Sequence, residues 1–239
     1  MAADIIVTSI PDDAVLESIG AGDNGILAGL SADKIWVDMS TVSPRAGRAM
    51  AERVRARGAL MLDAPVSGSV PQVQSGTLTI MVGGDEGAYA RVEPVLRVLG
   101  TPTRIGGNGH GLALKLAINI SLAVQMLAFC EGLLLVARDG VDLKLASDVM
   151  TSSPIGSPML KLRAPLILDL PPEAWFNIGL MRKDVRLALA MGRQLGMSLP
   201  SSEAADKVLS EGVVLGYEGR DIAGLFEVLK RAMPQHQLT

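Results

Sequence analysis

The sequence holds few of the residues that disulfide-linked and metal-binding proteins depend on. It has one cysteine, Cys130, and two histidines, His110 and His236, among 239 residues. A single cysteine excludes an internal disulfide, and so few cysteine and histidine ligands make a zinc site unexpected. We expect no bound metal. Because Cys130 stands in a long apolar run, we expect it to be a buried core thiol.

Aromatic residues and net charge are also low. Aromatic residues form 3% of the chain, and the formal net charge is -3. Surfaces that bind single-stranded nucleic acid use aromatic stacking, and nucleic-acid sites in general need an excess of basic residues. We therefore expect no nucleic-acid partner. The first residues, MAADIIVTSI, lack the basic leader of a signal peptide, so we expect a cytoplasmic protein.

The most prominent stretch that is present covers residues 109–137, GHGLALKLAINISLAVQMLAFCEGLLLVA, and is almost wholly apolar. Residues 116–137 are long enough to span a bilayer. Glu131 and other polar residues argue against a span, because a glutamate at mid-bilayer costs roughly 2.5 kcal/mol or more. We expect a buried helix and no membrane partner.

One lysine, Lys115, stands in this apolar stretch, four residues before Asn119. In a helix the two side chains project from the same face, one turn apart. Burying an unpaired ammonium group is costly, so the lysine must reach solvent, pair with another group or line a site. From the residues alone, a lysine that reaches solvent is the simpler interpretation.

The first part of the chain alternates strands and helices. Ser43 is a plausible helix N-cap, with Pro44 at the first helical position. Strand–helix–strand alternation is the pattern of βαβ units in a parallel sheet. The predicted strands cover residues 4–10, 34–39, 59–63, 76–83 and 103–105, with a helix at 85–98.

After residue 108 the apolar spacing is helical to the end of the chain. The sequence thus predicts an α/β fold class, with a parallel-sheet domain at residues 1–108 followed by an all-α domain at residues 109–239, joined by a long helix. The predicted helices cover residues 109–139, 143–151, 158–168, 178–195, 203–211 and 221–231.

Three loops follow the expected carboxyl ends of the first strands, where parallel sheets bind ligands. They are residues 9–11, residues 40–41 and residues 64–69, and all are small, polar or turn-forming. This composition suits a cofactor or substrate site, and it equally suits simple turns. No G-x-G-x-x-G occurs in the chain, and the glycine-rich residues 106–111 have the wrong spacing for a dinucleotide fingerprint.

Four stretches together resemble the β-hydroxyacid dehydrogenase family, within the 6-phosphogluconate dehydrogenase superfamily. The family contains 3-hydroxyisobutyrate dehydrogenase and the tartronate, glyoxylate and succinic semialdehyde reductases. The order and spacing of the four stretches agree with the family over essentially the whole chain. The stretches are VDMSTVSP (37–44), DAPVSGSVPQVQSGTLTIMVGG (63–84), GHGLALKLAIN (109–119) and LMRKDVRLAL (180–189).

The resemblance implies an NAD(P)-dependent oxidoreductase with a partial Rossmann-like domain, which interconverts a small β-hydroxy acid and its semialdehyde. The preference between NAD and NADP is not readable. Lys115 resembles the family's catalytic lysine, which acts as general acid and base. Asn119 resembles the asparagine that orients the substrate and this lysine, and Lys183 resembles a lysine that reaches cofactor and substrate from the helical domain. We expect Asp184 to be a helix or domain-docking partner.

Two further groups of residues match family motifs. Ser67-Gly68-Ser69 resembles the Ser-Gly-Gly loop that holds the substrate carboxylate. Here Ser69 replaces a glycine, which could add a hydrogen-bond donor or narrow the pocket. Ile10 and Pro11 resemble the Leu-Pro pair beside the cofactor, and Thr41 resembles the cofactor-contacting threonine.

In the family, a G-x-G-x-x-G strand, its helix and a second strand precede the strand that residues 4–10 resemble, roughly 60 residues in all. We therefore expect an N-terminally truncated member, with residues 4–10 as an edge strand open to pairing. Two alternatives stay open: a catalytically incompetent fragment that serves only as an oligomerising scaffold, and an imine reductase-like enzyme. Imine reductases usually lack the lysine at position 115. The apolar helices after residue 140 suggest a homodimer or a larger homo-oligomer.

Overall fold

The computed structural model describes residues 3–233 of the chain, so His236 lies outside the described residues. The chain folds as two compact units, Met1–Ile118 and Asn119–Thr239, which we name the sheet unit and the helical unit. The boundary lies within helix α5 (His110–Arg138), whereas the sequence placed it at residue 109. The first turns of α5 belong to the sheet unit because Leu112 is buried in that unit's core.

Strands β1, β2 and β3 of the sheet unit are parallel, with Thr8, Asp38 and Asp63 in register at their carboxyl ends. Strand β5 runs antiparallel to β3 and β4, and β6 is parallel to β5. The α/β fold class is confirmed, but the sheet is mixed rather than parallel throughout. The described strands are β1 (Ile5–Thr8), β2 (Ile35–Asp38), β3 (Leu60–Asp63), β4 (Val66–Ser67), β5 (Leu78–Gly84) and β6 (Gly100–Gly106).

The reversal has a local cause. After β3 the chain enters β4, turns through the short helix α3 (Val70–Ser75), and pairs back on β4 as a hairpin does. Strand β5 therefore returns beside β3 in the opposite direction, without the long crossover that a parallel neighbour needs. At the other side of the sheet, among the described residues, β1 pairs with β2 alone. The predicted edge position of residues 4–10 is confirmed.

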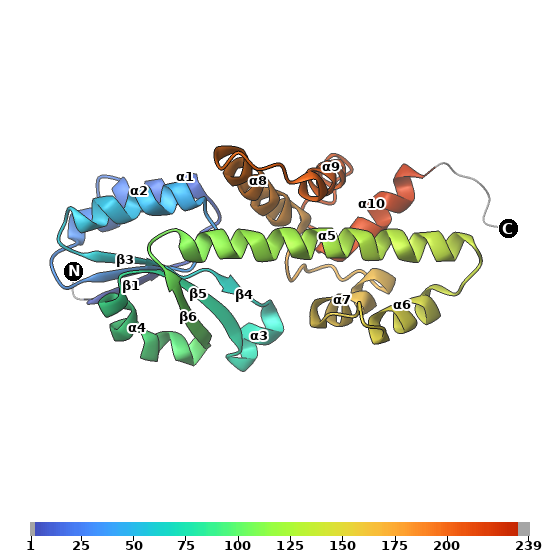
Figure 1. The fold of residues 1–239 in the computed structure, drawn as a ribbon, viewed down its shortest axis with the longest axis horizontal. Helices are drawn as coiled ribbons and strands as arrows, with labels where there is room; N and C mark the ends of the chain where they lie inside the picture. The colour runs from blue at the N-terminus through green and yellow to red at the C-terminus, as the bar shows by residue number, and fades with distance from the viewer. Residues whose placement is uncertain (1–2, 234–239) are drawn as a thin grey trace. The chain divides into compact units, whose positions relative to one another are not determined.

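Helices cover both faces of the sheet. Helices α1 (Asp13–Ala21) and α2 (Pro44–Arg55) lie on one side, and α4 (Glu86–Leu99) lies on the other (Figure 1). Side chains alternate along each strand, so Trp36 packs with α1 and α2 while Val37 packs with α4. A 3₁₀ helix, η1 (Ile26–Gly29), follows α1. As predicted, Ser43 caps α2, with its Oγ accepting the Ala46 N–H at 3.1 Å.

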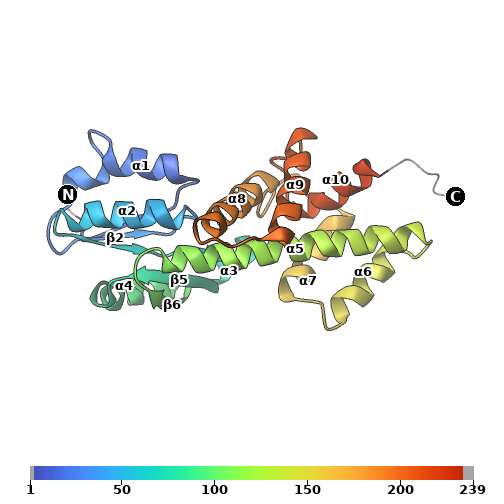
Figure 2. The same cartoon turned by 45° about the horizontal axis from the view of Figure 1, so that its top comes forward.

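The helical unit packs around the second half of α5. Helices α6 and α7 lie on one side of this helix, and α9 and α10 lie on the other (Figures 1 and 2). The five helical segments predicted after α5 are all present, with small shifts at their ends. They are α6 (Leu143–Ser152), α7 (Pro158–Leu168), α8 (Ile178–Gln194), α9 (Pro200–Val214), and η2 (Ile222–Gly224) followed by α10 (Leu225–Ala232).

Within residues 3–233, α5 is the one helix whose length and apolar composition would allow it to cross a membrane. In the helical unit it supplies Met126, Phe129 and Cys130 to the buried core, which is how a core helix behaves. Burial raises the pKa of the Cys130 thiol to about 12, and the nearby Glu131 carboxylate adds to the rise. The thiol is therefore protonated at neutral pH, and the prediction of an unreactive core cysteine agrees with its burial.

A buried ion pair fixes the entry to α8. The Asp221 carboxylate pairs with Arg163 of α7 at 2.5 Å, and its second oxygen accepts the Trp175 and Phe176 backbone N–H groups at 3.0 and 3.2 Å. Several donors thus offset the cost of burying this charge. Asp221 thus holds Trp175 and Phe176, which lead into α8, next to Arg163 of α7.

A second buried carboxylate, that of Asp38, ties together the chain segments that follow β1 and β2. Its Oδ1 accepts the hydroxyl groups of Thr8 at 2.9 Å and Ser40 at 2.6 Å. The Ser40 hydroxyl oxygen in turn accepts the Ile10 N–H at 2.8 Å. Among the described residues, Asp38 Oδ2 has no hydrogen-bond partner. Burial raises the pKa of the Asp38 carboxyl, and the bonds from Ser40 and Thr8 act against that rise.

This raised pKa predicts a pH dependence of stability. Since the folded-state pKa lies above the unfolded one, near 3.8, ionisation of Asp38 costs more in the folded chain. Its contribution to the unfolding free energy should be intact below the unfolded pKa and lost as pH rises through the folded pKa. Asp38→Asn cannot ionise, so urea unfolding between about pH 4 and 7 should show wild type losing stability relative to this variant. Asp23→Asn, at an exposed carboxylate, is the control. A difference in unfolding free energy between wild type and Asp38→Asn that does not change with pH would contradict the raised pKa of Asp38.

Candidate active site

The carboxyl ends of the parallel strands β1, β2 and β3 meet at one edge of the sheet, where ligands bind in such folds. Ile10 and Pro11 follow β1, and Thr41 follows β2. The bond from Ile10 N–H to Ser40 Oγ joins the two segments directly beside Thr41. The structure therefore brings together three of the residues that the sequence assigned to cofactor binding.

The loop after β3 carries Ser67, Gly68 and Ser69. Ser67 is held in β4 opposite Thr79 of β5. Gly68 has φ +137°, and a Cβ atom there would come within 2.7 Å of the Leu78 side chain, so the loop requires glycine at this position. This geometry leaves Ser67 half-buried and Gly68 exposed at the turn.

Ser69, which replaces a family glycine, is the N-cap residue of α3. Its backbone N–H donates to Oε1 of Gln72 at 2.9 Å, which is half of a capping box. The sequence left open whether Ser69 adds a donor to the substrate loop. In the structure the backbone N–H of Ser69, a group that a glycine also has, donates within the loop and stabilises the short helix that follows.

The start of α5 is bound to the end of β3. Asp63 is 2% exposed, and its two carboxylate oxygens accept the Gly109 N–H at 2.7 Å and the Leu112 N–H at 3.1 Å. Burial raises the pKa of the Asp63 carboxyl, and these two amide bonds oppose the rise. Lys115 is half-buried and follows Leu112 by less than one helical turn. The lysine is thus carried by a helix that begins at the same edge of the sheet.

In the helical unit, Asn119 and Lys183 meet at Asp184. The Asn119 side chain is 1% exposed, and its amide donates to Asp184 Oδ2 at 2.6 Å. The Lys183 ammonium lies 3.1 Å from Asp184 Oδ1. The sequence gave Asp184 only a docking role, whereas the structure shows it bound to two predicted site residues.

The predicted site residues are therefore gathered in two groups, each within its own unit. The sheet unit holds Ile10, Pro11, Thr41, Lys115 and the Ser67–Ser69 loop, and the helical unit holds Asn119 and Lys183. Asp38 and Asp63 were not predicted from the sequence as residues that support the site. The signal that could have found them is an acidic residue closing each of two apolar strands, IWVD and LMLD.

His110 is the first residue of α5 and is exposed, as expected, although it is helical rather than part of a loop. Within residues 3–233, no group of three or more histidine, cysteine, aspartate or glutamate side chains is arranged to hold a metal ion.

Two protein-family models match the chain in succession. The NAD binding domain of 6-phosphogluconate dehydrogenase matches residues 1–109, and the NAD-binding domain of NADP-dependent 3-hydroxyisobutyrate dehydrogenase matches residues 109–229. Both models describe domains that bind nicotinamide dinucleotides, so the cofactor is NAD or NADP.

Individual relatives agree with these models. The Escherichia coli 2-hydroxy-3-oxopropionate reductase is 33% identical over 99% of this chain and 81% of its own length. The Arabidopsis thaliana chloroplastic glyoxylate/succinic semialdehyde reductase 2 is 31% identical over 93% of this chain, which spans 62% of that protein. Among solved structures, Psf3 in complex with NADP+ and 2-OPP is 27% identical with a TM-score of 0.87, over 95% of this chain and 81% of that one.

The matches extend along both units and include each of the four motifs that suggested the resemblance. Identity of about one third over nearly the full chain is well beyond what a shared fold alone requires. The chain belongs to the β-hydroxyacid dehydrogenase family of NAD(P)-dependent oxidoreductases.

Proposed function

We propose that the protein interconverts a small β-hydroxy acid and its semialdehyde, in the manner of 3-hydroxyisobutyrate dehydrogenase, with Lys115 as general acid and base. The observation that carries the proposal is the anchoring of α5. The bonds from Asp63 start the Lys115 helix at the sheet edge where Thr41 and the Ser67 loop also lie.

Each proposed role follows from the chemistry of the side chain. A bound NADH or NADPH supplies the hydride. The Lys115 ammonium donates a proton to the carbonyl oxygen during reduction, and the neutral amine accepts it during oxidation. The Ser67 hydroxyl and the Gly68 N–H suit a substrate carboxylate. Asn119 orients the substrate, and Lys183 contacts cofactor and substrate.

The proposed substrate loop has one feature that bears on specificity. Because the Ser69 N–H already donates to Gln72, this amide is not offered to a carboxylate while the cap is intact. We assign carboxylate binding to the Ser67 hydroxyl and the Gly68 N–H.

The loops that follow β1 and β2 support the proposed binding of the cofactor. Ile10 and Pro11 follow β1, Thr41 follows β2, and the bond from the Ile10 N–H to Ser40 Oγ joins these two loops at the carboxyl ends of the strands. The pyrophosphate fingerprint G-x-G-x-x-G is not within these 239 residues. A second candidate function is an oligomerising scaffold without catalysis, which the exposed apolar side chains Leu145 and Val149 of α6 favour.

Cofactor titration separates these two functions. If the chain is an oxidoreductase as it stands, adding NADPH or NADH should change its tryptophan fluorescence with saturation below about 1 mM. Heat-denatured protein under the same titration is the control for inner-filter effects. No binding of either cofactor at millimolar concentration would contradict the enzyme proposal for this chain and favour the scaffold.

Replacement of the proposed acid tests the mechanism. In a form of the protein that turns over, Lys115→Ala should lower kcat by roughly 100-fold or more, the usual contribution of a positioned acid or base. Its cofactor affinity should change less than about twofold, because the lysine acts on the substrate oxygen. Lys144→Ala, at an exposed lysine on α6, is the matched control. Unchanged turnover in Lys115→Ala would remove this lysine from the mechanism.

A substrate test separates the imine reductase-like alternative. If the protein reduces an imine rather than an aldehyde, that alternative is favoured.

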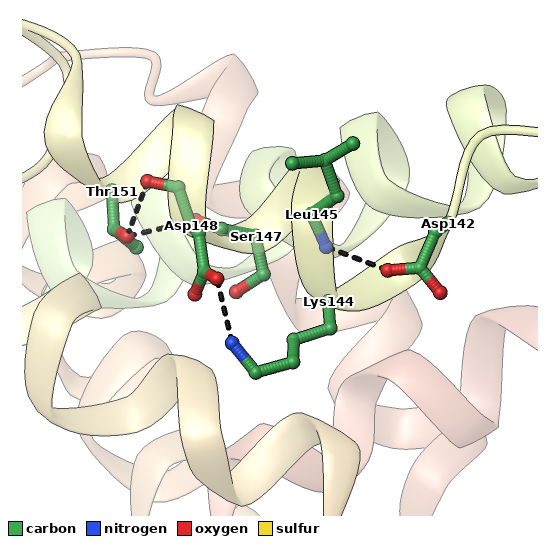
Figure 3. Close-up of polar contacts among 6 residues, drawn as sticks. All are labelled: Asp142, Lys144, Leu145, Ser147, Asp148 and Thr151. Carbon is green, nitrogen blue, oxygen red and sulfur yellow. Dashed lines mark hydrogen bonds and ion pairs between the residues drawn. The ribbon is translucent and has the colours of Figure 1, made fainter.

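We also propose that the chain forms a homodimer or a larger homo-oligomer, through apolar side chains of the helical unit. Leu145 and Val149, one turn apart on α6, are each 58% exposed, and Leu135 on α5 is 73% exposed. Figure 3 shows the Leu145 side chain directed away from the Lys144–Asp148 ion pair of the same helix. Leu145 and Val149 thus form an exposed apolar strip beside this ion pair, and an exposed apolar strip of this kind can pack against a partner.

Light scattering measures this assembly directly. The particle mass should be at least twice the 25.0 kDa of one chain, and Leu145→Lys with Val149→Lys should reduce it. A single-chain mass for the unmodified protein at micromolar concentration would contradict the proposal. A cytoplasmic location stays a prediction, which cell fractionation can test.

A further inference from the structure

The carboxylate of Asp63 occupies a closed socket made of backbone. Its two oxygens are used separately, one on the Gly109 N–H and the other on the Leu112 N–H. These amides belong to the start of α5, where N–H groups have no partner within the helix and where negative charge is favoured. One side chain thus completes the first turn of a 29-residue helix from a neighbouring strand.

Two glycines make the room for this carboxylate. A Cβ atom at Gly83 would lie 2.5 Å from Asp63 Oδ2, and one at Gly111 would lie 2.9 Å from the same oxygen. Both distances are shorter than any real contact of that kind, so neither position accepts a side chain while Asp63 keeps its place. The sheet and the helix therefore approach each other closely enough to close around the carboxylate.

Asp63 also connects two segments with proposed functional residues, the loop that carries Ser67 and the helix that carries Lys115. Along the strand it is followed by the segment that leads to Ser67 in β4, whose register on β5 is fixed by the pair Ser67↔Thr79. Through its two hydrogen bonds it holds the helix that carries Lys115, which lies about 4.5 Å along the axis from Leu112. Both segments belong to the sheet unit.

We infer that Asp63 is a positioning residue for the proposed reaction, which sets Lys115 in place relative to the Ser67 loop. The inference rests on the proposed function, because Lys115 and Ser67 owe their roles to it. An acid must be held close to the atom that it protonates, and a displacement of about 1 Å can cost roughly 100-fold in rate. A rigid helix with its first turn fixed to the strand provides that precision.

The variant Asp63→Asn keeps the size of the side chain but removes its charge, and it turns an –NH2 group toward one of the two amide donors. In the full chain, hydrogen exchange at the Gly109 and Leu112 amides should become at least about tenfold faster. In a form that turns over, kcat should fall at least about tenfold while the KM for the cofactor stays within about twofold.

Asp38→Asn is the matched control for exchange. Asp38 is the in-register neighbour of Asp63 on β2 and is also buried, but its bonds go to Thr8 and Ser40. Exchange at Gly109 and Leu112 should therefore stay at the wild-type rate in this variant. Equal acceleration in both variants would mean general loosening of the sheet and would overturn the inference.

Two other outcomes overturn it as well. Wild-type exchange at Gly109 and Leu112 in Asp63→Asn would show that the carboxylate does not hold the helix, and faster exchange with unchanged kcat would show an anchor without a positioning role. If Asp63→Asn does not fold, hydrogen exchange is measured on the unmodified chain. Exchange at Gly109 and Leu112 as fast as at the exposed Gly107 would then show that Asp63 does not hold the first turn of α5. Failure of the proposed function is seen separately, as unchanged turnover in Lys115→Ala.

Discussion

The bond pair between the Asp63 carboxylate and the first turn of α5 is the interaction on which the arrangement of the sheet unit depends. A buried carboxylate is unfavourable unless several donors reach it, and here backbone amides provide them. The helix dipole adds to the attraction. Because the chain continues from Asp63 into the Ser67 loop and from the helix to Lys115, one charge fixes both segments.

Local pattern was sufficient to locate most elements. The apolar spacing gave α7 at residues 158–168 without error, and the Ser43-Pro44 pair marked the start of α2. These features depend on neighbours in the sequence, which is why a single sequence reveals them. The edge position of β1 was predicted on different grounds, from the resemblance to a family sheet with further strands.

The features that sequence reasoning missed all depend on contacts between distant residues. The antiparallel course of β5 follows from its pairing with β4 across α3, and nothing in the run of apolar residues at 76–83 distinguishes the two directions. The bond between Asn119 and Asp184 joins residues 65 positions apart. A motif can name both residues, but only the folded chain shows that they meet.

Four aspartates are buried among the described residues, and each closes a junction. Asp38 and Asp63 sit at strand ends, Asp221 fixes the segment before α8, and Asp184 joins α8 to α5. Hydrogen bonds to a buried carboxylate are directional, so they add to close apolar packing a fixed position for each donor. In a chain with 3% aromatic residues, few large rigid side chains are available to fix the interior. Buried carboxylates take that part here, and three of them stand within four residues of Thr41, Ser67 or Lys183. The residues proposed for catalysis and binding are thus held in place by electrostatics, and their supports are as specific as the residues themselves.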